Sequence, residues 1–228
     1  MLERGYYYSI TFEPMKPLRP YLPLVLVLFC SITLSTLAVG AERTPTDDLR
    51  PILDALTEIL NDETLKGSEK REERRETIMA VISCGFDFRE MSKRVLGKTW
   101  REISEQEQDQ FTVLMTKLLE NVYLGKLEGY TENDPGKIAQ SLEYIGESVK
   151  DDRAQVSVLL DNAGVKIPVH YIMRQEGPVW VVYDINIEGV SLVRNYQEQF
   201  RSILRTENFS GLVKVIEEKN QSFLEEAQ

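Results

Sequence analysis

The segment 183–200, YDINIEGVSLVRNYQEQF, contains the side chains of this sequence with the strongest potential for chemistry. Asp184 and Glu188 carry carboxylates that could serve as a general acid or base. Ser191 lies in GVSLV, which departs from the GxSxG pattern of a nucleophile elbow, so a nucleophilic role is not indicated. The alternative roles are structural: Asp184 would anchor a turn or a helix N-terminus, and Glu188 would be a solvated loop residue. The residue types favour these structural roles.

The sequence gives little indication of a metal or cofactor site. The single histidine, His170, falls on the polar face of a predicted strand and has no cysteine or histidine nearby in the chain. A zinc site needs three or four nitrogen or sulfur ligands, so metal binding through His170 is not expected. The chain also lacks GxGxxG, Walker and HExxH motifs. We therefore expect no enzyme activity, no metal and no resident cofactor.

From Ser141 onward, apolar and polar residues alternate with the period of a β-strand. The pattern predicts strands at 142–149, 153–160, 165–174 and 179–185. Short turns separate these segments, so the strands should run antiparallel as a meander. One face of each strand is apolar and the other polar, which predicts a sheet with helices packed on one face only.

The segments before and after the predicted strands have the periodicity of helices. Asp87 and Gly97 predict the start and end of one helix. Ser104 and Glu107 form a capping box that opens a long second helix. A helix at 191–205 and a separate last helix should follow the strands. Helices that come before and after an antiparallel sheet in the chain define an α+β domain.

Two further features are expected to have no chemical role. The mixed-charge run 70–76, KREERRE, is typical of a solvated helix face. Cys84 lies beside apolar residues, which favours a buried, unreactive thiol.

Residues 1–41 have the features of a secretory signal peptide. Basic residues precede an uncharged stretch, 20–41, whose last residues are small enough for cleavage. Residues 1–14 fit this pattern poorly, and we expect them to be a mis-called extension before a true start at Met15. The alternative is an uncleaved membrane anchor, because the uncharged stretch is long enough to span a bilayer.

The net charge of the chain limits the classes of partner that it can bind. Residues 1–41 contain three basic and two acidic side chains, so their removal changes the net charge from −10 to −11. Such a charge repels nucleic acid and anionic lipid headgroups. The remainder, 42–228, is expected to form a single domain.

Together with FDFREMSKRVLGKTW at 86–100, segment 183–200 resembles the MlaC family of periplasmic phospholipid-binding proteins, also known as toluene-tolerance auxiliary proteins. The resemblance runs from about Asp48 to about Ile216. It implies that the four-stranded antiparallel sheet curls into an NTF2-like cone and, with the helices on one face, encloses an apolar lipid pocket.

The resemblance also implies a function. The protein would be a periplasmic, monomeric phospholipid shuttle that maintains the lipid asymmetry of the outer membrane. Its partners would be an outer-membrane lipoprotein–porin complex and an inner-membrane ABC transporter with a hexameric periplasmic lipid-binding subunit. It would carry phospholipid as cargo and would not bind nucleic acid. Two alternatives remain open: a carrier of another lipid such as a hopanoid, and a small enzyme in a cone-shaped fold that uses Asp184.

The residues expected to line the pocket come from the long helix, the apolar strand face and the turn that leads to the next helix. They are Tyr123, Leu127, Val169, Tyr171, Ile185 and Val190. Trp180 is a weaker candidate because it alternates onto the opposite strand face from Val181.

Overall fold

The structure of the protein is a computed structural model that describes residues 43–133, 142–162 and 164–226, without the side chains of 126–133, 162 and 226. The predicted signal peptide, 1–41, lies outside the described residues. Among the helices that are described, none combines the length and the hydropathy needed to cross a membrane.

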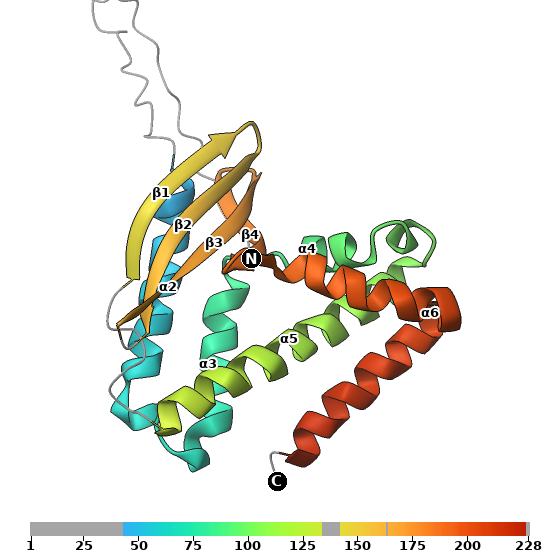
Figure 1. Cartoon of the computed structure of the whole chain (residues 1–228), viewed down its shortest axis with the longest axis horizontal. Coiled ribbons are helices and arrows are strands. Elements are labelled where there is room, and N and C mark those ends of the chain that lie inside the picture. The colour runs from blue at the N-terminus through green and yellow to red at the C-terminus, as the bar shows by residue number, and fades with distance from the viewer. Residues whose placement is uncertain (1–42, 134–141, 163, 227–228) are drawn as a thin grey trace, which may run out of the picture. The chain divides into compact units, whose positions relative to one another are not determined.

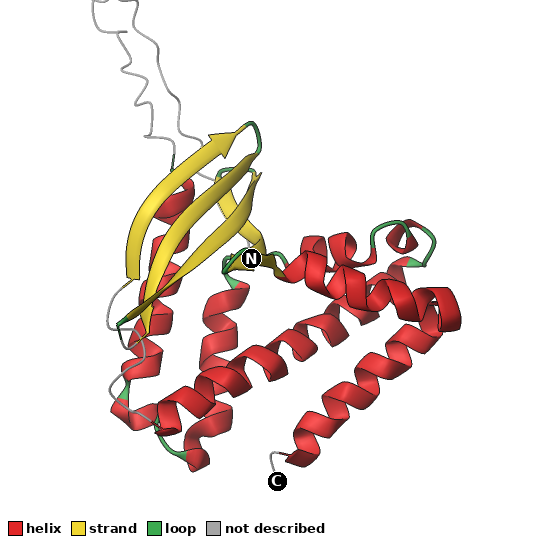
Figure 2. Ribbon diagram, in the orientation of Figure 1, coloured by secondary structure: helices red, strands yellow, loops and turns green. Residues whose placement is uncertain are grey.

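The chain folds into helices, then an antiparallel sheet, then helices (Figures 1 and 2). The elements before the sheet are α2 (Pro45–Asn61), the short 3-10 helices η1 (Glu63–Leu65) and η2 (Ser68–Lys70), α3 (Arg71–Ser83), α4 (Phe88–Leu96), the 3-10 helix η3 (Thr99–Arg101) and α5 (Glu105–Asn133). The strands are β1 (Leu142–Lys150), β2 (Arg153–Asn162), β3 (Val165–Glu176), β4 (Val179–Ile187) and β5 (Val190–Ser191), and α6 (Leu192–Glu226) follows them. The predicted α+β class is confirmed.

The sheet is a meander with the strand order β1-β2-β3-β4-β5, and every neighbouring pair is antiparallel. The four predicted strands are present, and the two-residue β5 adds a fifth where the sequence indicated only a turn. The register shifts between Tyr144 and Gly146 in β1, and between Ile172 and Met173 opposite β4. Because a bulge adds a residue to one strand and bends it, these shifts contribute to the curl of the sheet.

Helix α2 covers the apolar face of the sheet, which we call the inner face. A buried cluster joins the two elements; it contains Leu49, Leu53, Ala154, Val156, Val158, Met173, Trp180 and Val182. Asp48, in the first turn of α2, accepts a hydrogen bond from the backbone N of Trp180 at 2.8 Å. The opposite face is polar, and there His170 Nδ1 lies 2.9 Å from Ser157 Oγ.

A second cluster is formed by α4, α5 and α6 and contains no strand residue. Phe111 on α5 packs edge-on against Phe200 of α6, with ring centroids 6.2 Å apart. Leu192, Tyr196 and Phe200 are buried, as their spacing predicts. Asn208 has a non-helical φ of 58° and breaks α6 into two segments, which correspond to the two helices predicted after the sheet.

The predicted caps are confirmed. Asp87 accepts a hydrogen bond from the N of Glu90 at 2.8 Å and begins α4, and Gly97 ends it with a φ of 58°. The backbone N of Glu107 donates to Ser104 Oγ, and its carboxylate accepts from the backbone N of Ser104 at 2.8 Å. These local signals depend on few residues, so the sequence alone identifies them.

Two minor predictions are wrong. The run 70–76 is not wholly solvated, because Arg74 is only 4% exposed and its Nη1 donates to the carbonyl of Leu65 at 2.6 Å. Cys84 is exposed at the C-cap position of α3, directly after the last helical residue. Its Sγ bonds only the carbonyl of Ala80, at 3.3 Å.

Candidate functional site

An apolar cavity of about 150 Å³ lies where the sheet meets the helices of the second cluster. It is lined by Met79, Ile82, Phe86, Phe88, Met91, Thr116, Leu119, Glu120, Tyr123, Leu124, Ile185, Ile187 and Leu192. The walls therefore come from α3, α4, α5, β4 and the first residue of α6. This arrangement can hold a hydrophobic ligand.

Strand β4 separates an apolar side from a polar side. Ile185 and Ile187 point into the cavity, whereas Asp184 and Asn186 line a hollow on the other side of the strand. This alternation follows from the period of two along a β-strand. The sequence pattern of β4 therefore positions one wall of the cavity.

Asp184 fixes the connection from β4 to α6. Its carboxylate accepts hydrogen bonds from Ser191 Oγ at 2.6 Å and from the backbone N of Val193 at 3.0 Å. In the turn between β4 and β5, Glu188 and Gly189 have φ values of 52° and 87°, as a tight hairpin turn requires. Glu188 is exposed. The structural role predicted for Asp184 is confirmed, and it holds Leu192 at the cavity wall.

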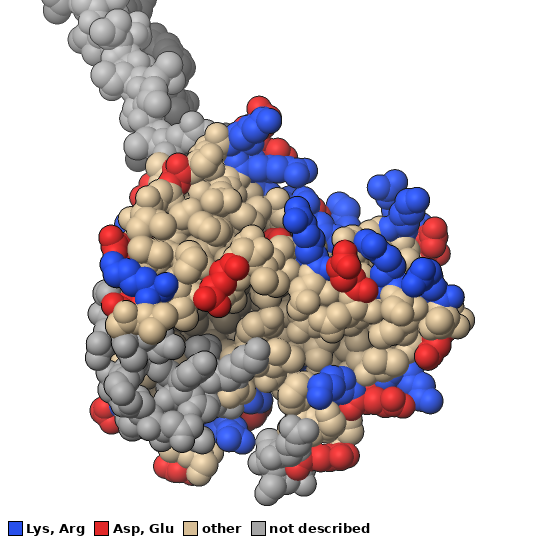
Figure 3. Space-filling view, viewed as in Figure 1, with Lys and Arg blue, Asp and Glu red and all other residues tan. Residues whose placement is uncertain are grey.

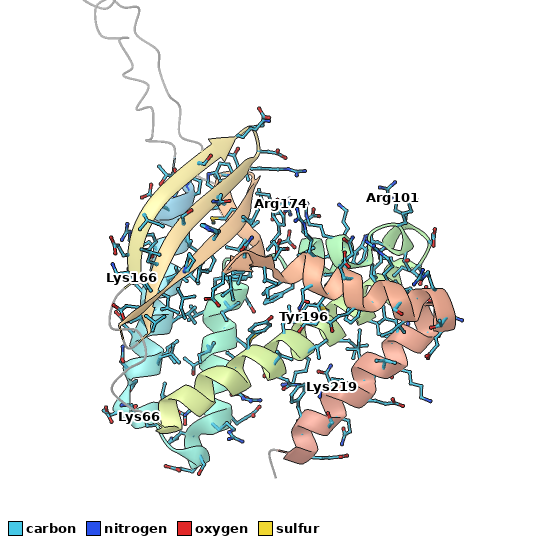
Figure 4. All side chains as sticks on the ribbon, in the orientation of Figure 1. Lys66, Arg101, Lys166, Arg174, Tyr196 and Lys219 are labelled. Atoms are coloured by element: carbon cyan, nitrogen blue, oxygen red, sulfur yellow. The ribbon has the colours of Figure 1, made fainter. Side chains whose placement is uncertain are left out.

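The cavity wall carries little charge. Glu120 is the acidic side chain in the lining, and Lys117 Nζ binds its Oε1 at 2.8 Å. Burial raises the pKa of Tyr123 above its ordinary value. Burial also raises the pKa of Tyr196, which lies between α6 and α5 (Figure 4), to about 12. Both hydroxyls are therefore neutral at physiological pH.

The residues that the structure describes contain no group of three or more His, Cys, Asp or Glu side chains that could hold a metal ion. His170 has Ser157 and Gln155 as neighbours.

Four of the predicted pocket residues lie in or beside the cavity. Tyr123 and Ile185 line the cavity. Tyr171 is opposite Ile185 in the β3–β4 register, and Val169 is opposite Ile187, so both lie on the inner face beside the cavity. These four residues come together around the junction of β3, β4 and α5.

The other candidates lie elsewhere. Trp180 is buried beneath α2 in the sheet cluster. Val190 is 56% exposed on β5 and does not line the cavity. The side chain of Leu127 lies outside the described residues.

The lining also contains residues that the sequence did not assign to the pocket, above all Met79 and Ile82 of α3. They belong to a short apolar segment that follows the charged run 70–76. A segment of this length does not show whether its residues line a cavity or belong to ordinary core. Phe88, Met91 and Leu119 lie on apolar stripes of the helices that Asp87 and Ser104 begin, and periodicity does not separate core from cavity.

The curled sheet, the helices on its inner face and the apolar cavity between them define a class of α+β proteins with an internal apolar cavity. The chain belongs to the MlaC family: the family's sequence profile, described as MlaC protein, matches residues 51–218. A solved structure of the phospholipid-binding protein from Ralstonia solanacearum, in complex with a phospholipid, has the same fold with a TM-score of 0.69. It is 22% identical, and the match covers 80% of this chain and 99% of that one. No curated protein matches the chain.

Proposed function

We propose that this protein binds one glycerophospholipid, with the acyl tails in the cavity and the headgroup at the surface. The observation that carries the proposal is the cavity itself, whose walls are almost entirely apolar. The shared fold of the phospholipid-bound Ralstonia protein and the family membership support the choice of ligand.

The energetics of lipid transfer require such a cavity. Each tail methylene that leaves water gains about 0.8 kcal/mol, so two long acyl chains in open solution would forgo more than about 20 kcal/mol of burial. A carrier must offer a comparably dry environment, or the lipid will stay in the bilayer. The net preference between carrier and bilayer can then be small, which lets partner proteins set the direction of transfer.

The cavity must widen to accept two tails. Its volume of about 150 Å³ is far below the roughly 1,000 Å³ expected for a phospholipid, at the upper end of ligand pockets. Helix α3 is the wall best placed to move, because it packs mainly on α2 and the short helices η1 and η2. Its Met79 and Ile82 face the cavity, and the unbranched Met side chain adapts easily to a ligand.

We further propose that the protein works in the periplasm as a shuttle between an outer-membrane lipoprotein–porin complex and an inner-membrane ABC transporter. A test is to mix lipid-loaded protein with proteoliposomes that contain the transporter complex and to follow a fluorescent phospholipid. Delivery should require the complex and should be much slower with protein-free anionic liposomes. Equal delivery to both would contradict the shuttle model and leave lipid binding intact.

An Asp184→Asn substitution tests the structural role of the Asp184 carboxylate. The amide oxygen can still accept from Ser191 or Val193, so we expect a loss of about 1 kcal/mol of stability, as for a weakened helix cap. The amount of bound phospholipid should not change. Chemical denaturation and lipid quantification measure both effects. Loss of bound lipid at unchanged stability would contradict a purely structural role.

A further inference from the structure

A groove follows α4 and the first half of α6, and at one end it extends onto β3 and β4. One hollow of about 480 Å³ is lined by Lys98, Arg201 and Arg205 among other residues. A neighbouring hollow of about 510 Å³ is lined by Arg94 and Arg194. Gln197 lines both hollows, so they lie side by side, and we treat them together as one groove. We call it the basic groove and define it by these five cations.

The cations stand out because the whole chain has a net charge of −10. Figure 3 shows Lys and Arg gathered over α4, η3 and the first half of α6, and Arg101, labelled in Figure 4, flanks the groove. Arg194, Arg201 and Arg205 are exposed and follow the helical spacing of one face of α6. Positive charge thus gathers over this part of the surface.

Most of these charges have no acidic partner among the described residues. Among the residues that the structure describes, no carboxylate forms an ion pair with Lys98, Arg194, Arg201 or Arg205. Arg94 differs, because Glu90 binds its guanidinium at 2.8 Å and Tyr183 stacks on it at 3.9 Å. The unpaired cations leave the groove able to bind an external anion.

The two walls of the groove are joined. Gln197 Nε2, on α6, donates to the carbonyl of Arg94 near the end of α4 at 3.2 Å. Asp184 lines the second hollow, but its oxygens already accept from Ser191 and Val193. The acidic group in the groove is thus engaged in fixing α6, and the walls are held before any ligand arrives.

We propose that the basic groove binds an acidic polypeptide segment of a partner protein. Guanidinium groups bind carboxylates in paired, directional hydrogen bonds, so a row of arginines suits a Glu- or Asp-rich segment. A bilayer fits less well, because the site is concave and the acidic remainder of the surface repels anionic lipid. This assignment does not depend on the lipid proposal.

The groove and the cavity share two helices. Met91 on α4 and Leu192 at the start of α6 line the cavity, whereas Val95 on α4 and Arg201 on α6 line the groove. A segment bound in the groove would therefore contact α4 and α6, two of the helices that also line the cavity.

The test measures binding of a fluorescein-labelled oligoglutamate peptide to the protein by anisotropy at low ionic strength. The double variant Arg201→Glu/Arg205→Glu should weaken binding at least about tenfold, because it reverses two charges that face the ligand. The control Lys150→Glu/Lys214→Glu has the same net charge and changes two exposed cations outside the groove. It should weaken binding less than about twofold.

Each result of this test has a clear reading. Equal weakening in the two double variants would overturn the proposal, since only net charge would then matter. Binding to phosphatidylglycerol vesicles but not to oligoglutamate would also overturn it and would identify a membrane-facing surface. If charge reversal impairs folding, the milder double variant Arg201→Gln/Arg205→Gln takes its place. It should give an intermediate loss of binding. Bound lipid, quantified in every variant, should stay constant, which separates failure of this proposal from failure of the lipid proposal.

Discussion

Replacing Ile185 with tryptophan should remove most of the bound phospholipid from a protein that still unfolds cooperatively. Ile185 points from β4 into the cavity, so the larger side chain would occupy space that the acyl tails need. In a close-packed core the same change would cost about 1–3 kcal/mol through overpacking. In a cavity that widens, the cost should lie at or below the lower end of that range. Lipid quantification and calorimetry of the same preparation measure the two effects.

Val113→Trp is the matched control for this experiment. Val113 is 69% exposed on α5 and does not line the cavity, so the added volume would extend into solvent. Lipid content and stability should both stay close to those of the parent protein. A large loss of stability in Ile185→Trp with normal lipid content would show that Ile185 is ordinary core.

Arg74→Ala should lower the free energy of unfolding by about 2–3 kcal/mol, a large effect for one residue in a charged run. Arg74 is buried on α3, and its Nη1 donates to the carbonyl of Leu65 at 2.6 Å and to that of Gly67 at 3.4 Å. The substitution leaves both carbonyls without this donor and frees the N-terminal end of a cavity-lining helix. Denaturant titration measures the change.

Glu72→Ala is the control for the Arg74 substitution, because Glu72 belongs to the same charged run and is exposed. It should change the free energy of unfolding by less than about 0.5 kcal/mol. Similar effects of the two substitutions would mean that Arg74 contributes no more than a solvated residue does.

The features that the sequence predicts correctly depend on neighbouring residues. Asp87 and Gly97 bound α4 as expected, and the capping box at Ser104 opens α5. The strands were also predicted, because one buried face imposes a period of two along the chain. Asp184 was assigned its anchoring role because a carboxylate before a helix has donors within reach.

The cavity wall was predicted only in part, because it depends on contacts between distant segments. Ile185 and Tyr123 were identified through the family resemblance, whereas Met79 and Ile82 have no local pattern that separates a wall from a core. Val190 was assigned to the pocket from its place in a turn. The structure instead pairs Val190 with Ile187 in a hairpin and leaves it exposed.

Native mass spectrometry of the purified protein, before and after solvent extraction, tests the central claim most directly. The account predicts one glycerophospholipid per chain, which extraction removes to leave a folded protein of lower mass. Because the headgroup would lie outside the cavity, several headgroup types should be found on the same preparation. A protein that carries no lipid, or one loaded with a sterol-like or hopanoid-like lipid, would contradict it.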